Sequence, residues 1–193
     1  MTGGEAFEGV LDAARDGDPA AWTTLYDLVA PVVVAYLRAQ SLPDPEDVAG
    51  ETLLQVVRDI DRFHGSERQF VSWSLSIAHH RMLDARRAMG RRPATPRPTD
   101  ELPVPGTGDL AADGALASEA WREIQGHLGS LTDDQREVVL LRVVADLSLE
   151  DTARVLGRSV GSVKALQHRA FSALRARLSD GRNPRGLGVA HPA

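Results

Sequence analysis

The chain has 193 residues, of which 42% are hydrophobic and 25% charged, an ordinary composition for one or two folded domains. It contains no cysteine, which excludes disulfides, zinc sites with thiolate ligands and thiol catalysis. The formal net charge of −5 argues against nucleic-acid binding only as long as the charge is treated as uniform.

The charge is in fact segregated along the chain. Residues 1–61 hold twelve acids and three arginines, residues 81–97 hold six arginines and one acid, and residues 158–177 hold five basic residues and no acid. Basic surfaces attract phosphates, whereas acidic surfaces repel DNA and can bind a basic protein. Solvated helix faces without a function would give the same pattern, so charge alone does not decide.

Targeting and membrane signals are missing from the sequence. The N-terminus has no positive charge ahead of an apolar run, as a secretory signal would. We expect no membrane span, since no stretch approaches the roughly 20 apolar residues that one needs. The sequence therefore predicts a cytoplasmic protein.

Apolar residues recur at three- and four-residue spacing through the first half, which predicts helices and no strands. We expect helices over residues 7–16, 20–39 and 44–60, a polar loop over 61–69, and a fourth helix from Phe70 onward. Asp44 is expected to cap the third helix, with Pro45 at its first position. The predicted core positions of the later three helices are Trp22, Leu25, Leu28, Val32, Tyr36, Val48, Leu53, Val56, Val57, Ile60, Phe70, Trp73, Ile77 and Met82.

A composition break divides the chain. Residues 93–114 contain five prolines and three glycines, which predicts a flexible linker between a domain at 1–92 and a second one at 115–180. The second domain begins with a helical stripe of Ala117, Trp121, Ile124 and Leu128. Residues 181–193 are predicted to be a disordered tail. The predicted fold class is therefore all-α, with two small helical domains.

The second domain carries a helix-turn-helix pattern. Capping boxes starting at Thr132 and Ser148 are expected to open helices over 133–145 and up to Leu156. Gly157 then turns the chain, and Ser159 is expected to cap a basic last helix that runs to about residue 178. A helix of this kind fits the major groove of DNA. A plain helical hairpin is the alternative.

The two faces of this last helix can be assigned from its periodicity. Its inward side is predicted to comprise Val163, Ala170, Phe171 and Leu174. Its outward side is predicted to comprise Lys164, His168, Arg175 and either Gln167 or Arg169. Lys164 and His168 lie near the helix N-terminus, the end that usually enters the groove.

The stretch LTDDQREVVLLRVVADLSLEDTARVLGRSVGSVKALQHRAFSALRARL resembles the promoter-binding domain 4 of bacterial sigma factors. The stretch DPEDVAGETLLQVVRDIDRF, followed by FVSWSLSIAHHRMLDARR, is similar to sigma domain 2. Two such domains with a loose linker and no domain 3 resemble the extracytoplasmic-function (ECF) group, over residues 7–178. The resemblance implies a protein that uses no cofactor and performs no catalysis. It implies that the chain binds promoter DNA, and that it binds core RNA polymerase at the clamp coiled coil and the flap. Most relatives are restrained by an anti-sigma factor, so the resemblance also implies such a protein as a possible partner.

The resemblance also implies which residues bind polymerase. The helix over residues 47–60 corresponds to the segment with which sigma factors bind the clamp coiled coil. The implied contacts are Asp47, Gly50, Glu51, Leu54 and Gln55. The family usually has glutamine where this chain has Gly50, and a glycine inside a helix costs about 1 kcal/mol.

The resemblance places the reader of the −10 element in the loop 62–69 and the following helix. The implied residues are Arg62, Phe63, His64, Arg68, His80, Arg81, Arg86 and Arg87. Phe63 and Arg68 suit stacking and hydrogen bonding to an unstacked base, and the later arginines suit phosphates. The family usually has asparagine where this chain has His80.

The resemblance places the reader of the −35 element on the last helix. The implied residues are Ser159, Ser162, Lys164, Ala165, Gln167, His168 and Arg169. The two serines and the first-turn amides can bind a phosphate. Many relatives carry Ser-Arg-Leu where this chain has Ala165-Leu166-Gln167, so Lys164, His168 and Arg169 are expected to supply more of the readout.

Other functions fit less well. His80 and Asp84 are spaced for a metal, but no further ligands converge on them and His79, so no metal site is predicted. Neither a phosphate loop nor a nucleophile motif appears, so no catalytic residue is predicted. The alternatives are a helix-turn-helix regulator that is not a polymerase subunit, including a response regulator, and a helical adaptor that binds only protein.

Overall fold

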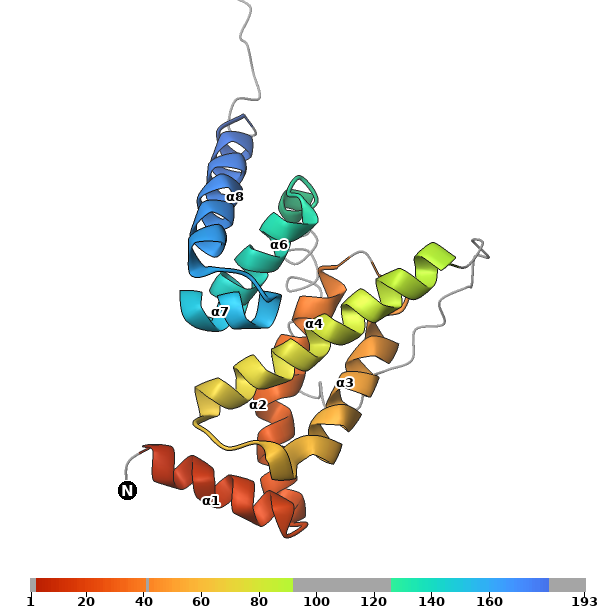
Figure 1. Cartoon of the computed structure of the whole chain (residues 1–193), viewed down its shortest axis with the longest axis vertical. Coiled ribbons are helices and arrows are strands. Elements are labelled where there is room, and N and C mark those ends of the chain that lie inside the picture. Colours follow the sequence, from red (N-terminus) through yellow and green to blue (C-terminus); the bar gives the residue numbers. More distant parts are fainter. Residues whose placement is uncertain (1–2, 41, 92–125, 181–193) are drawn as a thin grey trace, which may run out of the picture.

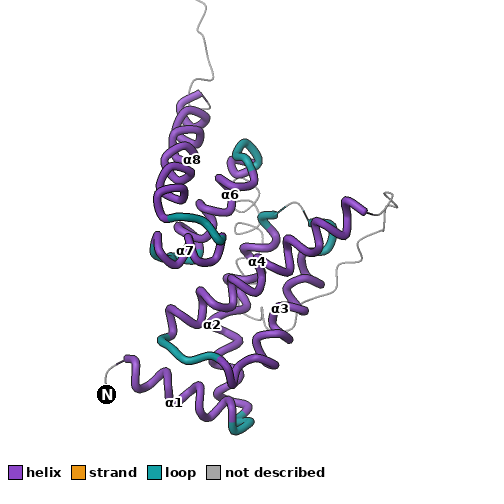
Figure 2. Tube along the Cα trace, viewed as in Figure 1, coloured by secondary structure: helices purple, strands orange, loops and turns teal. Residues whose placement is uncertain are grey.

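A computed structural model describes residues 3–40, 42–91 and 126–180. Within these ranges every regular element is a helix (Figure 2), as the sequence predicts. The first part holds α1 (Gly3–Arg15), α2 (Pro19–Arg38), α3 (Pro45–Asp59), the short 3-10 helix η1 (Ile60–Arg62) and α4 (Glu67–Arg91). The second part holds α6 (Asp133–Val139), the π-helical η2 (Leu140–Val144), α7 (Leu149–Leu156) and α8 (Val160–Asp180).

Several expectations lie outside the described residues. They are the linker over 93–114, the tail over 181–193, and the start of the helical stripe at Ala117, Trp121 and Ile124. The domain boundaries drawn at these places stay predictions. Leu128, the last member of that stripe, is described, helical and buried.

Helix α4 packs against α2 and α3 and crosses α2 diagonally in Figure 1, whereas α1 packs on α2 and η1 at one end of the bundle. Their starts follow local chemistry: Asp18 caps α2 by accepting from the amides of Ala20 and Ala21, and Asp44 caps α3 through the amide of Asp47, with Pro45 at the first position. Such caps satisfy amides that have no partner inside the helix. Phe70, Leu75 and Met82 of α4 form the centre of the bundle, fully buried.

Helix α2 is long and apolar enough to cross a membrane, judged by length and composition. The expectation that no stretch comes near this limit was therefore wrong. Packing within the bundle accounts for the apolar sequence, because α2 buries seven side chains and contacts α1, α3, α4 and η2. An α-helix covered on several sides is apolar around much of its circumference.

The predicted loop and part of the predicted core of this bundle need correction. Residues 61–69 are not all loop, since η1 ends at Arg62 and α4 already begins at Glu67. Val57 was predicted to be buried but is 47% exposed, because it lies on the outer side of α3 while Val56 and Ile60 face inward.

The second part forms the predicted helix-turn-helix, with refinements. The capping box at Thr132 and Gln135 is present. Ser148 caps α7 through the amide of Asp151, but its hydroxyl also donates to the Asp151 carboxylate, so the reciprocal half of a capping box is not made. Gly157 adopts φ 61°, a left-handed turn that favours glycine.

The inward side of α8 also differs from the prediction in one position. Val163 and Ala170 are fully buried as expected, and Leu166 is buried with them. Phe171 was predicted to face inward but is 37% exposed. In a helix, residues 163, 166 and 170 follow one face, and 171 lies about 100° away from 170.

The two parts of the molecule pack against each other. In Figure 1, α7 lies over the N-terminal half of α4, and the two helices are in contact. One continuous apolar cluster joins Phe70 and Met82 of α4 to Leu141 and Leu147 of the second part. The orientation of the helix-turn-helix relative to α4 is therefore fixed by apolar contact as well as by polar contacts.

Candidate nucleic-acid and protein interfaces

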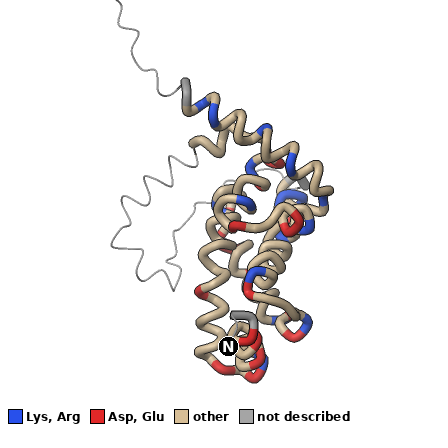
Figure 3. Tube along the Cα trace, turned by 90° about the vertical axis from the view of Figure 1, so that its left-hand side faces the viewer, with Lys and Arg blue, Asp and Glu red and all other residues tan. Residues whose placement is uncertain are grey.

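The N-terminal half of α8 presents an exposed polar surface. Ser159 caps the helix, its hydroxyl 3.2 Å from the amide nitrogen of Ser162. Lys164, Ala165, His168 and Arg169 are all exposed there. Basic residues continue along the helix as far as Arg177, and Figure 3 shows them in blue at intervals along α8. A capped helix N-terminus with exposed cations suits insertion beside phosphates and base edges.

Gln167 is held differently from its neighbours on α8. It is half-buried, and its side-chain oxygen accepts a hydrogen bond from Nε of Arg142 at 3.3 Å. Arg142 also donates to the carbonyl of Leu147. Gln167 therefore ties α8 to η2, and the candidate residues that remain exposed here are Ser159, Lys164, Ala165, His168 and Arg169.

The loop before α4 contains Phe63, which the sequence analysis predicts to stack on an unstacked DNA base. Phe63 is only 6% exposed, and its ring packs 5.1 Å from those of both Phe70 and Trp73. The chemistry of the ring suits stacking, but in this arrangement it belongs to the core. Gly65 adopts φ 155°, and a Cβ there would meet the side chain of Gln69 at 2.6 Å.

The remaining candidates of the loop and α4 are distributed over a long surface. Arg62, His64, Arg68, His80 and Arg87 are exposed, whereas Arg81 and Arg86 are partly buried. The helix α4 has 25 residues, which at 1.5 Å per residue makes about 37 Å. Its cations therefore fit a row of phosphates better than a compact ligand.

Several of these arginines already have partners. Arg81 donates to Glu51 at 2.7 Å and to Gln55 at 3.1 Å, both on α3. Arg86 bonds to Gln40 at 2.9 Å and to Glu137 at 3.2 Å. The structure thus links the candidate DNA residues to the acidic helix and to the second part of the molecule, a connection that the sequence did not reveal.

The outer face of α3 combines acids with exposed apolar side chains. Asp47, Gly50 and Glu51 are exposed, and Gln55 is half-buried. Leu54 is 56% exposed and Val57 47% exposed. Large apolar groups beside carboxylates are suited to a basic protein surface with apolar contacts.

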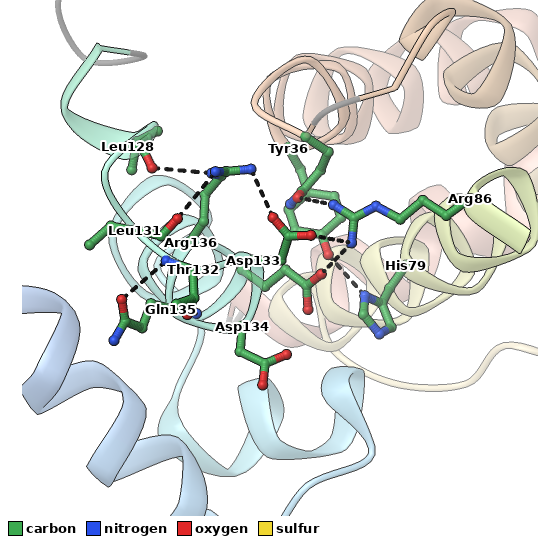
Figure 4. A network of polar contacts seen from close by, with 12 residues as sticks. Tyr36, His79, Arg86, Leu128, Leu131, Thr132, Asp133, Asp134, Gln135 and Arg136 are labelled. Atoms are coloured by element: carbon green, nitrogen blue, oxygen red, sulfur yellow. Dashed lines mark hydrogen bonds and ion pairs between the residues drawn. The ribbon is translucent and has the colours of Figure 1, made fainter. Parts of the chain in front are cut away.

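His79 of α4 and Tyr36 of α2 form a buried polar pair between the two helices, shown in Figure 4. The Tyr36 hydroxyl lies 2.9 Å from Nδ1 of His79. Burial, with positive charge on His80, Arg86 and Arg158, lowers the pKa of His79 to about 4. The imidazole is therefore neutral at neutral pH, and its hydrogen bond is structural.

His79 and His80, the two histidines that the sequence placed near Asp84, have separate hydrogen-bond partners. In the described ranges no group of three or more His, Asp or Glu side chains converges. His79 turns toward Tyr36, whereas Nδ1 of His80 contacts the carbonyl of Ser76 at 2.7 Å. The two histidines thus face different partners.

Sequence reasoning missed Glu137 and Arg136. Both are buried, at 5% and 8% exposure. Arg136 donates to the carbonyls of Leu128 and Leu131 and to Asp133. The available signal was the position of Arg136 and Glu137 directly before the apolar run 138–141, which suggests that they are buried with it. Charged residues are almost never fully buried unless they are paired, so each of the two could have been expected to have a partner.

Comparison with known proteins identifies both parts. Residues 21–92 match the family Sigma-70 region 2, and residues 127–176 match Sigma-70, region 4. The chain is 34% identical to the ECF RNA polymerase sigma factor SigD of Mycobacterium tuberculosis over 179 residues, covering 89% of this chain and 84% of that protein. It is 35% identical to the ECF RNA polymerase sigma factor ShbA of Streptomyces griseus over 176 residues, covering 86% and 92%.

Solved structures share the fold. CnrH, solved in complex with the cytosolic domain of CnrY, superposes with a TM-score of 0.62 at 24% identity, covering 89% of this chain and 96% of that chain. RpoE of Bartonella quintana, solved with the anti-sigma factor NepR, gives a TM-score of 0.62 at 23% identity, covering 82% and 96%. With both regions present in order along nearly the whole chain, the protein belongs to the ECF RNA polymerase sigma factors.

Proposed function

We propose how the residues of this ECF sigma factor divide the work of binding core RNA polymerase and directing transcription initiation at promoters. Residues 1–92 bind polymerase and the −10 element, and residues 115–180 bind the −35 element. The observation that supports this division most directly is the exposed Lys164, Ala165, His168 and Arg169 surface on a capped α8, opposite a buried face.

The acidic face of α3 is proposed to bind the clamp coiled coil of the polymerase. Leu54 supplies apolar area, and Asp47, Glu51 and Gln55 supply acceptors. The flap is the second proposed contact of the polymerase. Because both DNA contacts are then tethered on one enzyme, each can be weak and still contribute to promoter choice.

The protein itself is proposed to catalyse no reaction and to act in the cytoplasm, where polymerase and chromosomal DNA are found. RNA synthesis would be the chemistry of the polymerase. Two similar structures were solved with protein partners, the cytosolic domain of CnrY and the anti-sigma factor NepR. A restraining protein of the anti-sigma class is therefore part of the proposal.

Run-off transcription tests the residue assignment. Core polymerase with the chain should start transcription from members of a genomic promoter library. Lys164→Ala and Arg169→Ala should each lower the initiation rate. If the substitution removes a phosphate contact, the plot of log affinity for promoter DNA against log salt concentration should also become less steep by about 0.9. Arg177→Ala is the matched control, since it removes one exposed cation from the distal end of α8.

Two outcomes would contradict the proposal. Failure of the starting protein to direct any start site would refute the function. Equal promoter choice by Lys164→Ala, Arg169→Ala and the starting protein would refute the assignment of α8 and favour an adaptor that binds only protein. A helix-turn-helix regulator that acts alone would instead bind its site tightly without polymerase.

A further inference from the structure

The C-terminal end of α1 is bound to the loop that connects η1 to α4. Nη2 of Arg15 donates to the backbone carbonyl of Phe63, 48 residues further along the chain. Nη1 of the same guanidinium lies 2.7 Å from the carboxylate of Asp12, one helical turn back in α1. In Figure 1, α1 lies across the end of the bundle where this loop runs. An arginine of the N-terminal helix thus fixes a backbone atom of the loop that is proposed to bind the −10 element.

The surroundings of Arg15 leave its guanidinium little freedom. Its side chain is 20% exposed, and its Nε is buried without a hydrogen-bond partner among the described residues. A buried donor without a partner costs free energy. The arginine keeps this orientation because Asp12 and the carbonyl of Phe63 hold its two terminal nitrogens, and hydrogen bonds from a charged donor are stronger than those between neutral groups.

The first residue of the loop, Phe63, is held at three of its groups. Its ring packs 5.1 Å from the rings of both Phe70 and Trp73. Its amide donates to the carbonyl of Ile60 at 3.1 Å, and its carbonyl accepts from Arg15. The carbonyl lies beyond the end of η1, so α1 supplies the hydrogen bond that a regular helix would otherwise provide.

The last residue of the loop, Ser66, is held by the start of α4. Its amide donates to Oε1 of Gln69 at 2.8 Å, and the amide of Gln69 lies 3.4 Å from the Ser66 hydroxyl, a reciprocal cap. Two residues remain between the anchored ends, His64 and Gly65, and both are exposed. Because glycine has no side chain, His64 carries the only side chain between the two anchors.

The chemistry of His64 suits a base that has left the duplex. An imidazole can stack on such a base, and its ring nitrogens donate and accept hydrogen bonds. Beside it, the side chain of Arg62 is 85% exposed and suits a phosphate. A hydrogen bond weakens steeply when it is misaligned, so His64 can distinguish bases only if its backbone is held in one place. Ordering a loose loop on binding would also cost entropy.

We propose that Arg15 is a positioning residue for −10 recognition, because it holds the carbonyl of Phe63 and so fixes the backbone from which His64 contacts an unstacked base. The inference rests on the proposed −10 role of the loop and deepens it. The base contact moves from Phe63, whose ring fills the core, to His64. Helix α1, which ends at Arg15 before the Sigma-70 region 2 match begins at residue 21, then contributes to recognition without contact with DNA.

The base preference of the holoenzyme tests this inference. Core polymerase with the chain transcribes two pools of a promoter found by run-off transcription, one randomised across the −10 element and one across the −35 element, with a barcode in each transcript. His64→Ala should flatten the preference at one or two adjacent −10 positions. Arg15→Met, which removes the donors but keeps a long side chain, should lower the ratio of best to worst base about five- to tenfold at the same positions. Its −35 preference should be unchanged.

The double variant separates positioning from an independent DNA contact. If Arg15 acts through His64, Arg15→Met combined with His64→Ala should match His64→Ala within about twofold, since two residues of one interaction are not additive. A further loss of about five- to tenfold in the double variant would mean that the two residues act separately, and it would overturn the inference.

Two further measurements separate positioning from a role in stability alone. Val33→Ala, at a position of α2 that is 0% exposed, should lower the urea midpoint at least as much as Arg15→Met and leave the −10 preference unchanged. Loss of the same preference in Val33→Ala would overturn the positioning role. In the free chain, Arg15→Met should speed hydrogen exchange of the peptide over residues 63–69 about tenfold, and an unchanged rate would overturn the anchoring.

Failure of the proposed function would give a different pattern. If the chain directs transcription and His64→Ala keeps the −10 preference, the assignment of the loop to the −10 element is wrong, whatever hydrogen exchange shows for Arg15→Met. If His64→Ala flattens the preference and Arg15→Met does not, the assignment of the loop is supported and the positioning role of Arg15 is refuted.

Discussion

The neutral, buried His79 predicts a specific loss of stability in acid. Its pKa falls from 6.5 to about 4 in the folded protein, through burial and through positive charge on His80, Arg86 and Arg158. The unfolded chain therefore binds a proton more readily than the folded one between these two values. The contribution of His79 is fully present above about pH 6.5 and is lost as the pH falls toward about 4.

The magnitude follows from the two pKa values. With 6.5 in the unfolded chain and about 4 in the folded protein, the linkage relation gives about 2 kcal/mol lost by pH 5 and about 3 kcal/mol lost by pH 4. That is a large part of the usual stability of a small domain. His79 is 6% exposed, so screening by solvent reduces this figure only modestly.

Urea unfolding at several pH values between 8 and 4 measures the effect. His79→Gln removes the titrating group, so its free energy of unfolding should fall less with acid than that of the starting protein. His80→Gln, which changes the exposed neighbour, should keep most of the fall. Parallel curves for His79→Gln and the starting protein would refute the assignment of a neutral buried imidazole.

Four further substitutions test the local reasoning. Gly50→Ala should raise the free energy of unfolding by about 0.5–1 kcal/mol, since a Cβ there meets nothing within 4 Å; an unchanged urea midpoint would contradict it. Thr132→Ala removes the hydroxyl that accepts from the Gln135 amide and should cost about 1 kcal/mol, read from the same urea curves, with no loss if the cap is unimportant. Leu75→Ala, at a fully buried position, should cost about 2–5 kcal/mol, whereas Leu54→Ala should leave stability within about 0.5 kcal/mol and weaken core polymerase binding about five- to tenfold; equal effects on stability would refute the inside-outside assignment of the two leucines.

Local chemistry in the sequence was enough to predict the helices. Each helix cap depends on residues only three positions apart: the side chains of Asp44, Thr132 and Ser159 accept hydrogen bonds from the amides of Asp47, Gln135 and Ser162. These roles can therefore be predicted without knowing the fold. The left-handed turn at Gly157 is equally local. The family resemblance then placed the two regions in order, and the comparisons confirm it.

Errors occurred where a side chain could face either of two directions. Val57 and Phe171 are apolar and have the spacing of buried positions, but both are exposed. The apolar stripe of a helix is about 100° wide or more, so periodicity does not decide whether a residue at the edge of the stripe is buried. The assignments of Phe63 and Gln167 to DNA stay predictions. In this structure the Phe63 ring packs against Phe70 and Trp73, and the side-chain oxygen of Gln167 accepts a hydrogen bond from Arg142.

The sequence by itself thus determined the caps, turns, helical periods and family of this protein, because each depends on residues close together in the chain or on a motif. Only the tertiary structure decided the partners of Arg68, Arg81 and Arg86, because those partners lie 26 to 78 residues away along the chain. The pairing of Arg86 with the buried Glu137 depends on how two separately encoded helical units pack, and no local rule specifies that contact.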